Sequence, residues 1–205
     1  MKILKTELAA LIAFIICITL STYKLDRECD GIRDGILRLH VIAASDSEED
    51  QRIKLQLRDE LLTAGKRIFS SSTTKTEAEQ KLTDGIDILQ KTADAFLKKQ
   101  GYPYKADVSL EKSYFPTRRY EGFTLPAGFY DALKVTVGSG EGQNWWCVMF
   151  PALCLPAAEG IETDFDGILT DSQQSIITDG KYEVRLWLVE KWQEAKRRFT
   201  VVSSQ

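Results

Sequence analysis

The side chains that could do chemistry in this chain include a single histidine, His40. Metal sites built from several histidines are therefore excluded, and any nucleophile activated by an imidazole would have to use this one ring. Cys147 is the thiol to consider for such a pair, because catalytic dyads are assembled in space and not by sequence spacing. The alternative is a strand histidine bonded to a backbone or carboxylate group. We expect this structural role and no catalytic residue, and a Cys/His hydrolase remains the second hypothesis.

Two further motifs resemble ligand sites, but each lacks an essential part. Asp46, Glu48 and Asp50 have the spacing that opens an EF-hand calcium loop, yet Leu57 stands where the closing glutamate is required. Glycines alternate through residues 138–142 after a predicted strand, but no amphipathic helix follows whose N-terminus could hold a phosphate. The sequence therefore predicts no metal ion and no cofactor.

Two cysteines and two tryptophans lie close together around residue 150. Cys147 and Cys154 flank six residues, and outside the cytoplasm so close a pair favours a disulfide. Such a bridge would stabilise the fold by roughly 2.5 kcal/mol; two free buried thiols are the alternative. Trp145 and Trp146 are adjacent, so on a strand their rings point to opposite faces. We expect one ring to be a surface anchor for a partner, and the alternative is that both are core residues.

The charge balance and the N-terminal segment limit the locations in which the protein can act. With 27 Lys+Arg against 30 Asp+Glu the net charge is -3, so no electrostatic attraction holds the chain on nucleic acid. Lys2 and Lys5 precede an apolar run at residues 8–20, which is the layout of a signal peptide. A helix of this run is roughly 20 Å long, shorter than the bilayer core, but no A-x-A cleavage signal follows it. We expect export, with residues 1–22 contacting the membrane and then either cleaved or retained as an anchor.

The rest of the chain predicts a polar linker at residues 23–35 and one α+β domain at residues 36–205. Ser45 and Glu48 fit a capping box that starts a helix. From apolar periodicity, the predicted elements are strands at residues 36–44, 106–111, 114–120 and 133–137, helices at about 47–66 and 75–99, and a C-terminal helix at 182–199. Residues 157–179 lack a sustained period and are predicted as a loop, with a short helix within it as the alternative. We expect an antiparallel sheet of about four strands packed against the two long helices, with these residues in the core: Leu57, Leu61, Leu82, Ile86 and Leu89.

Three sequence segments are specific enough to indicate a family. They are LRLHVIAASDSEEDQRIKLQLRD at residues 37–59, FPTRRYEGFTLPAGFYDALKVTVG at residues 115–138 and GEGQNWWCVMFPALC at residues 140–154. Together with VEKW at residues 189–192, they resemble the stage II sporulation protein R family of endospore-forming bacteria. The chain departs from the family pattern at Ala44, where Asn is expected, and at Ala152, where a second proline is expected.

The resemblance implies a signalling protein and not an enzyme. It implies that the protein is made in the forespore and exported into the space between the two septal membranes. There it would activate a membrane-embedded aspartic protease of the mother cell, which cleaves the precursor of a sigma factor. We place the contact with this partner at the adjacent tryptophans and the helix start near them, on Ser45, Asp46, Gln143, Asn144, Trp145 and Trp146. The alternative function is an exported Cys/His hydrolase acting on cell wall or peptide.

Overall fold

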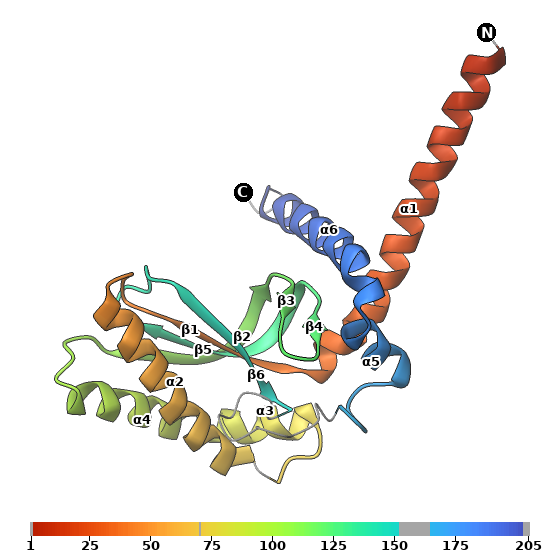
Figure 1. Ribbon diagram of the computed structural model, residues 1–205. Coiled ribbons are helices and arrows are strands. Elements are labelled where there is room, and N and C mark those ends of the chain that lie inside the picture. Colours follow the sequence, from red (N-terminus) through yellow and green to blue (C-terminus); the bar gives the residue numbers. More distant parts are fainter. Residues whose placement is uncertain (1, 70, 152–164, 203–205) are drawn as a thin grey trace. The chain divides into compact units, whose positions relative to one another are not determined.

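The structure, a computed structural model, describes residues 2–69, 71–151 and 165–202 (Figure 1). The chain divides into two compact units, and each is considered by itself. The sheet unit comprises Arg33–Phe115 and Phe129–Leu169, and the helical unit comprises Met1–Ile32, Pro116–Gly128 and Thr170–Gln205.

The sheet unit combines a four-stranded sheet with helices, which confirms the α+β prediction. The strands are ordered β2-β5-β1-β6, with β1 at Leu37–Ile42, β2 at Ala106–Phe115, β5 at Gly128–Val137 and β6 at Asn144–Phe150. The helices are α2 (Glu48–Phe69), α3 (Lys75–Asp84) and α4 (Ile86–Lys99). Figure 1 shows α2 and α4 lying along the same side of the strands.

The sheet is mixed, which corrects the expected wholly antiparallel arrangement. Leu39 of β1 lies opposite Leu133 in a parallel pairing with β5, and opposite Cys147 in an antiparallel pairing with β6. Parallel neighbours need a long crossover, and β1 is separated from β5 by three helices, α2 to α4, and three strands, β2 and the two short strands of a hairpin. Apolar alternation is the same in both kinds of pairing, so the sequence pattern alone does not distinguish them.

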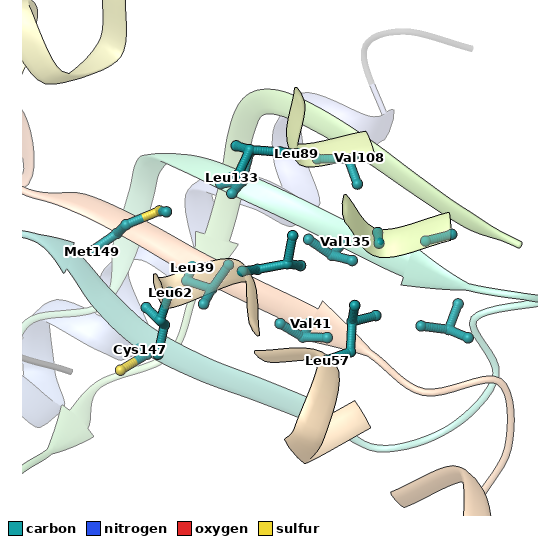
Figure 2. Close-up of a cluster of buried hydrophobic side chains, with 14 of the residues drawn as sticks. Leu39, Val41, Leu57, Leu62, Leu89, Val108, Leu133, Val135, Cys147 and Met149 are labelled. Carbon is teal, nitrogen blue, oxygen red and sulfur yellow. The ribbon is translucent and has the colours of Figure 1, made fainter. Parts of the chain in front are cut away.

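The core lies between the sheet and these helices. Alternate residues of β1 are fully buried, at Leu37, Leu39 and Val41. In Figure 2, Leu57 and Leu62 of α2 lie in the same cluster as the strand residues. We call this side of the sheet the helix face. Four of the predicted core residues are buried and the fifth, Ile86, is partly buried against the same cluster; the four are Leu57, Leu61, Leu82 and Leu89.

Helix α2 begins with a different cap from the predicted one. The Asp50 N–H donates to Ser47 Oγ at 3.2 Å, so Ser47 is the capping residue. Ser45 Oγ instead donates to the Asp50 carboxylate at 2.5 Å. The predicted capping box of Ser45 and Glu48 is therefore wrong, although the acidic first turn of the helix is present.

The single helix predicted for residues 75–99 is two helices. Gly85 follows the last residue of α3 and precedes the first residue of α4. Glycine has the highest conformational entropy of any residue, so it lowers helix stability where it stands. A Cβ at this position would lie 3.0 Å from Ile68 Cδ1 of α2, so the break also allows the helices to approach closely.

The strand predicted for residues 114–120 belongs to two elements. Tyr114 and Phe115 end β2, and the chain then forms the short hairpin of β3 (Arg118–Arg119) with β4 (Thr124–Leu125). Pro116 separates them, because proline has no N–H to continue a strand ladder.

The helical unit combines both ends of the chain with this hairpin. Its helices are α1 (Lys2–Gly35, of which the last residues belong to the sheet unit), α5 (Asp171–Thr178), the 3-10 turn η1 (Gly180–Tyr182) and α6 (Glu183–Val202). Helix α6 confirms the predicted C-terminal helix. Helix α5 is the short helix that was the alternative within the loop predicted for residues 157–179, and Thr170 and Gln173 form its capping box.

Residues 23–35, predicted as a polar linker, are helical and continue α1 without a break. Asp26 is 2% exposed, and its carboxylate accepts hydrogen bonds from Gln193 Nε2 and Lys196 Nζ of α6, each at 2.6 Å. Contacts with α6 therefore order the second half of α1.

Within the described part of the chain, the segment Thr6–Gly35 is long and apolar enough to cross a membrane, and a signal sequence at an N-terminus meets the same criterion.

Candidate partner-binding site

The residues predicted to bind a partner come together at one end of the sheet unit. In the antiparallel pairing of β1 with β6, Trp145 lies opposite Val41 and Trp146 lies opposite His40. The turn after β1 carries two of the predicted residues, and the start of β6 carries the rest: Ser45 and Asp46 in the turn, Gln143, Asn144, Trp145 and Trp146 at the strand. Strand pairing therefore places all six within two adjoining segments.

The loop between β5 and β6 is fastened to the turn after β1. The Gly142 N–H donates to Ala43 O at 3.0 Å, and the Gln143 N–H donates to Asp46 Oδ1 at 2.8 Å. A Cβ at Gly142 would lie 2.3 Å from the carbonyl oxygen of Ser45, so this close approach requires glycine. The glycine motif therefore serves to dock the loop on the turn, and the two segments form one support for the tryptophans.

Lys54 of α2 holds the same loop from the helix face. Its Nζ donates to Gln143 O at 2.9 Å and to the side chain of Gln51. Burial lowers the pKa of Lys54, and the Asp46 carboxylate opposes that shift. The amine thus satisfies a loop carbonyl while it stays close to a carboxylate, which adds a third attachment between the loop and the rest of the unit.

Trp145 lies at the rim of the helix face. Its side chain is 36% exposed, and the guanidinium of Arg58 lies 4.4 Å from the centre of its ring. Arg58 also pairs with Asp59 at 2.7 Å, so the cation is held in place over the ring. An exposed tryptophan with an arginine stacked on it combines the two side-chain types that most often dominate binding energy at protein interfaces.

Trp146 lies on the opposite face of the sheet, as alternation along a strand predicts. Its ring stacks on the His40 ring with centroids 5.9 Å apart, and His40 also meets the Phe115 ring edge at 5.8 Å. Asn144 Oδ1 lies 2.7 Å from His40 Nε2. We call this side of the sheet the aromatic face. Trp146 is half-buried there, so less of its ring than of the Trp145 ring is available to a partner, and its main role is to pack against His40.

His40 is a strand histidine with a structural role, but its hydrogen-bond partner is the Asn144 side-chain amide and not the expected backbone or carboxylate group. Burial lowers its pKa, while the hydrogen bond to Asn144 acts in the opposite direction. If Asn144 Oδ1 accepts, Nε2 carries the proton and Nδ1 does not. Among the described residues, the buried Nδ1 has no hydrogen-bond partner. A neutral ring that stacks between aromatic residues fits this environment.

The proposed Cys/His dyad does not form. Cys147 lies opposite Leu39 and belongs to the core of the helix face, whereas His40 lies on the aromatic face. Cys147 is also disulfide-bonded, so its sulfur cannot act as a thiolate. Cys154, the predicted partner in the disulfide, lies outside the described residues, and the pairing stays a prediction. The geometry therefore argues against the hydrolase alternative.

Arg38 is a residue of this region that the sequence analysis missed. It is fully buried, its guanidinium carbon lies 4.1 Å from the Phe115 ring centre and 5.0 Å from that of Tyr130, and Nε donates to Cys147 O at 3.3 Å. An arginine at an inward position of an otherwise apolar strand was the available signal. Among the described residues, no three His, Cys, Asp or Glu side chains gather closely enough to hold a metal ion.

Comparison with known proteins gives a consistent result. The model of the family described as stage II sporulation protein R matches residues 33–159. The chain is 35% identical over 123 residues to stage II sporulation protein R of Bacillus subtilis (strain 168), an alignment that covers 60% of this chain and 55% of that relative. The chain thus matches little more than half the length of this relative. No solved structure matches the chain.

Proposed function

Because the chain belongs to the stage II sporulation protein R family, we propose that it is a sporulation signal that leaves the cell that makes it and acts on a partner in another membrane. In this proposal the forespore exports the protein into the intermembrane space. Its partner is a membrane-embedded aspartic protease of the mother cell, which then matures a sigma factor precursor. The protein binds and activates this protease and is not itself an enzyme.

The observation that carries the proposal is the supported tryptophan at the end of the β1–β6 pair. Trp145 is partly exposed, lies under Arg58 at the start of β6, and follows a loop that hydrogen bonds fasten to the turn after β1. A preorganised aromatic side chain loses little conformational entropy on binding, so more of its contact energy contributes to affinity. Ser45, Asp46 and Gln143 are exposed polar residues of the turn and the loop that precede it, and they suit the hydrated rim of an interface.

The N-terminal helix supports export. The large apolar side chains of residues 8–20 are exposed in α1, as expected for a segment whose environment is a membrane or the export machinery. The folded helical unit uses Asp26 of the same helix, so a cleavage that preserves this unit has to fall before that residue.

The test is restoration of sigma factor precursor processing in a sporulating strain that lacks its own copy of this protein. Residues 21–205 joined to a cleavable signal peptide should restore processing, whereas the same residues without a signal peptide should not, because a receptor in the opposing membrane is reached only from outside. Processing driven by the form trapped in the cytoplasm would contradict the proposal.

The binding surface is tested in the same strain with single substitutions. Trp145→Ala should abolish processing with nearly unchanged stability. A matched control is Ile88→Ala on α4, which removes another large exposed apolar side chain, 58% exposed, and should leave processing unchanged. Equal processing by the two variants would remove Trp145 from the receptor contact.

A further inference from the structure

Helix α6 of the helical unit carries a second exposed apolar surface. Leu186, Val189 and Gln193 are buried and define its inner side by their helical spacing. Val184, Trp187 and Trp192 are 73%, 54% and 37% exposed. At 100° per residue, the two tryptophans flank the outer side, with the exposed Val184 between them. Leu188 also falls between them, but it is partly buried and lines the gap against α1. Two exposed tryptophans within six residues of one helix are costly in water and indicate a partner surface.

Basic side chains accompany this apolar stripe. From residue 185 to residue 198, α6 carries the exposed basic side chains of Arg185, Lys191, Lys196, Arg197 and Arg198 against two acidic residues, Glu190 and Glu194, and Glu194 pairs with Lys191 at 2.9 Å. Lys196 Nζ lies 5.4 Å from the centre of the Trp192 ring. Helices that lie flat on membranes combine tryptophans on one side with lysine and arginine beside them. The local charge is positive although the whole chain has a net charge of -3.

The position of α6 against α1 identifies the partner as a bilayer. The apolar run of α1 ends at Leu20, and Arg185 NH2 lies 3.5 Å from Ser21 Oγ in the next position. A small gap of about 80 Å³ between the helices is lined by Ile18, Ser21, Thr22, Leu25, Arg185 and Leu188. The first turns of α6 therefore lie at the level where the apolar run of α1 gives way to polar residues. When that run is in a membrane, this level is the interface, where tryptophan is enriched.

We infer that the outer side of α6 is a membrane-binding surface that lies on an anionic bilayer beside the apolar segment of α1. Trp187 and Trp192 enter the headgroup region, and Lys191 and Arg198 contact lipid phosphates. The Asp26 contacts with Gln193 and Lys196 fix the angle between the two helices, so both meet the bilayer as one body. This inference concerns lipid alone and does not depend on the receptor contact.

The test reads the environment of the two α6 tryptophans in the full chain. Trp145→Phe with Trp146→Phe leaves Trp187 and Trp192 as the emitting residues. The protein is reconstituted in vesicles of phosphatidylcholine and phosphatidylglycerol whose acyl chains are brominated near the headgroup. We expect bromine to reduce tryptophan emission by roughly two-fold or more relative to unbrominated vesicles, because the rings lie at that depth.

A charge variant tests the contribution of the lipid phosphates. Lys191→Gln with Arg198→Gln should weaken the quenching, and replacing phosphatidylglycerol by phosphatidylcholine should do the same. The matched control, Lys98→Gln with Lys99→Gln, removes the same charge from exposed positions of α4 and should leave the quenching unchanged. An equal effect of both pairs would show a response to net charge and would overturn the proposed lipid contact.

Absence of quenching, with α1 inserted and the fold intact by circular dichroism, would also overturn the inference. So would a dimer of the full chain in detergent that Trp187→Ala converts to monomer, because the surface would then bind a second copy. The assay contains no protease, so either result leaves the proposed signalling function to its own test.

Discussion

The two faces of the four-stranded sheet are built from different side chains, although they alternate along the same strands. On the helix face, Leu39 and Val41 meet leucines of α2 and α4 in contacts that depend on volume and not on direction (Figure 2). On the aromatic face, Arg38 and His40 meet rings in oriented cation and stacking contacts. Successive residues of β1 therefore contribute in turn to the apolar core and to the support of the candidate site.

The largest expected effect is on the helix face. Leu57→Ala should lower the free energy of unfolding by about 2 to 5 kcal/mol, because removal of this fully buried side chain leaves a cavity in the core. Leu57→Met, which nearly preserves volume, should cost less than about 1.5 kcal/mol. Urea unfolding followed by circular dichroism measures both. A near-neutral alanine variant would place α2 on the surface and remove the contrast between the faces.

A smaller loss of stability is expected at Arg38, whose contacts depend on the orientation of its guanidinium group. Arg38→Ala should cost about 1 to 3 kcal/mol, since it removes the contacts with two rings and the hydrogen bond to Cys147 O. Arg38→Lys retains the charge but not the planar fork, so we expect it to recover only part of the loss. If lysine restores full stability in the same urea measurement, the aromatic face depends on charge and not on orientation.

The two tryptophans should differ in stability even though they are neighbours. Trp145→Ala should cost no more than about 1 kcal/mol, because its ring is partly exposed and its principal described contact is the cation of Arg58. Trp146→Ala should lower the melting temperature more, since its half-buried ring stacks on His40. Equal shifts in thermal melting would show that the site is not split between a presented ring and a supporting ring.

The smallest expected effect is a pH dependence at His40. Burial lowers its folded-state pKa below the ordinary value of 6.5, so the unfolded chain binds a proton more readily. The stability from the neutral ring is therefore complete above pH 6.5 and is lost as the pH falls through the lower folded pKa. Urea unfolding between neutral pH and about pH 5 should show a steeper loss in the wild type than in His40→Gln. Identical slopes would mean that the histidine is not buried in solution.

The sequence predicted those features of the fold that depend on the spacing of apolar residues within one strand or helix. The alternation in β1 and the stripe of α2 follow from burial of one side of each element, and the opposite directions of Trp145 and Trp146 follow from strand geometry. The parallel pairing of β1 with β5 could not be predicted, because it depends on which distant strands meet. The helical state of residues 23–35 depends on Gln193 and Lys196, which reach Asp26 from the other end of the chain.

The residues of the candidate site could be grouped from the sequence, but their contacts could not. The neighbouring tryptophans and the glycine motif are visible in the sequence, whereas the cation over Trp145 comes from α2 and the ring pair around Arg38 comes from β2 and β5. The close approach of Gly142 to Ser45 shows that the loop is docked on the turn. This docking could not be predicted, because a main-chain contact is marked in the sequence only by the glycine.

Because α1 is one unbroken helix, it fixes the distance between the apolar run and the residues that pack against α6. From Leu20, the last residue of the apolar run, to Asp26, where α6 is attached, the helix rises about 9 Å. A form of the protein that keeps this helix has no slack between its membrane and its folded body, unlike a protein on a disordered tether. In the proposed function, a receptor in the opposing membrane must then approach to within roughly the dimensions of one small protein, so the spacing of the two membranes would itself decide when the signal is delivered.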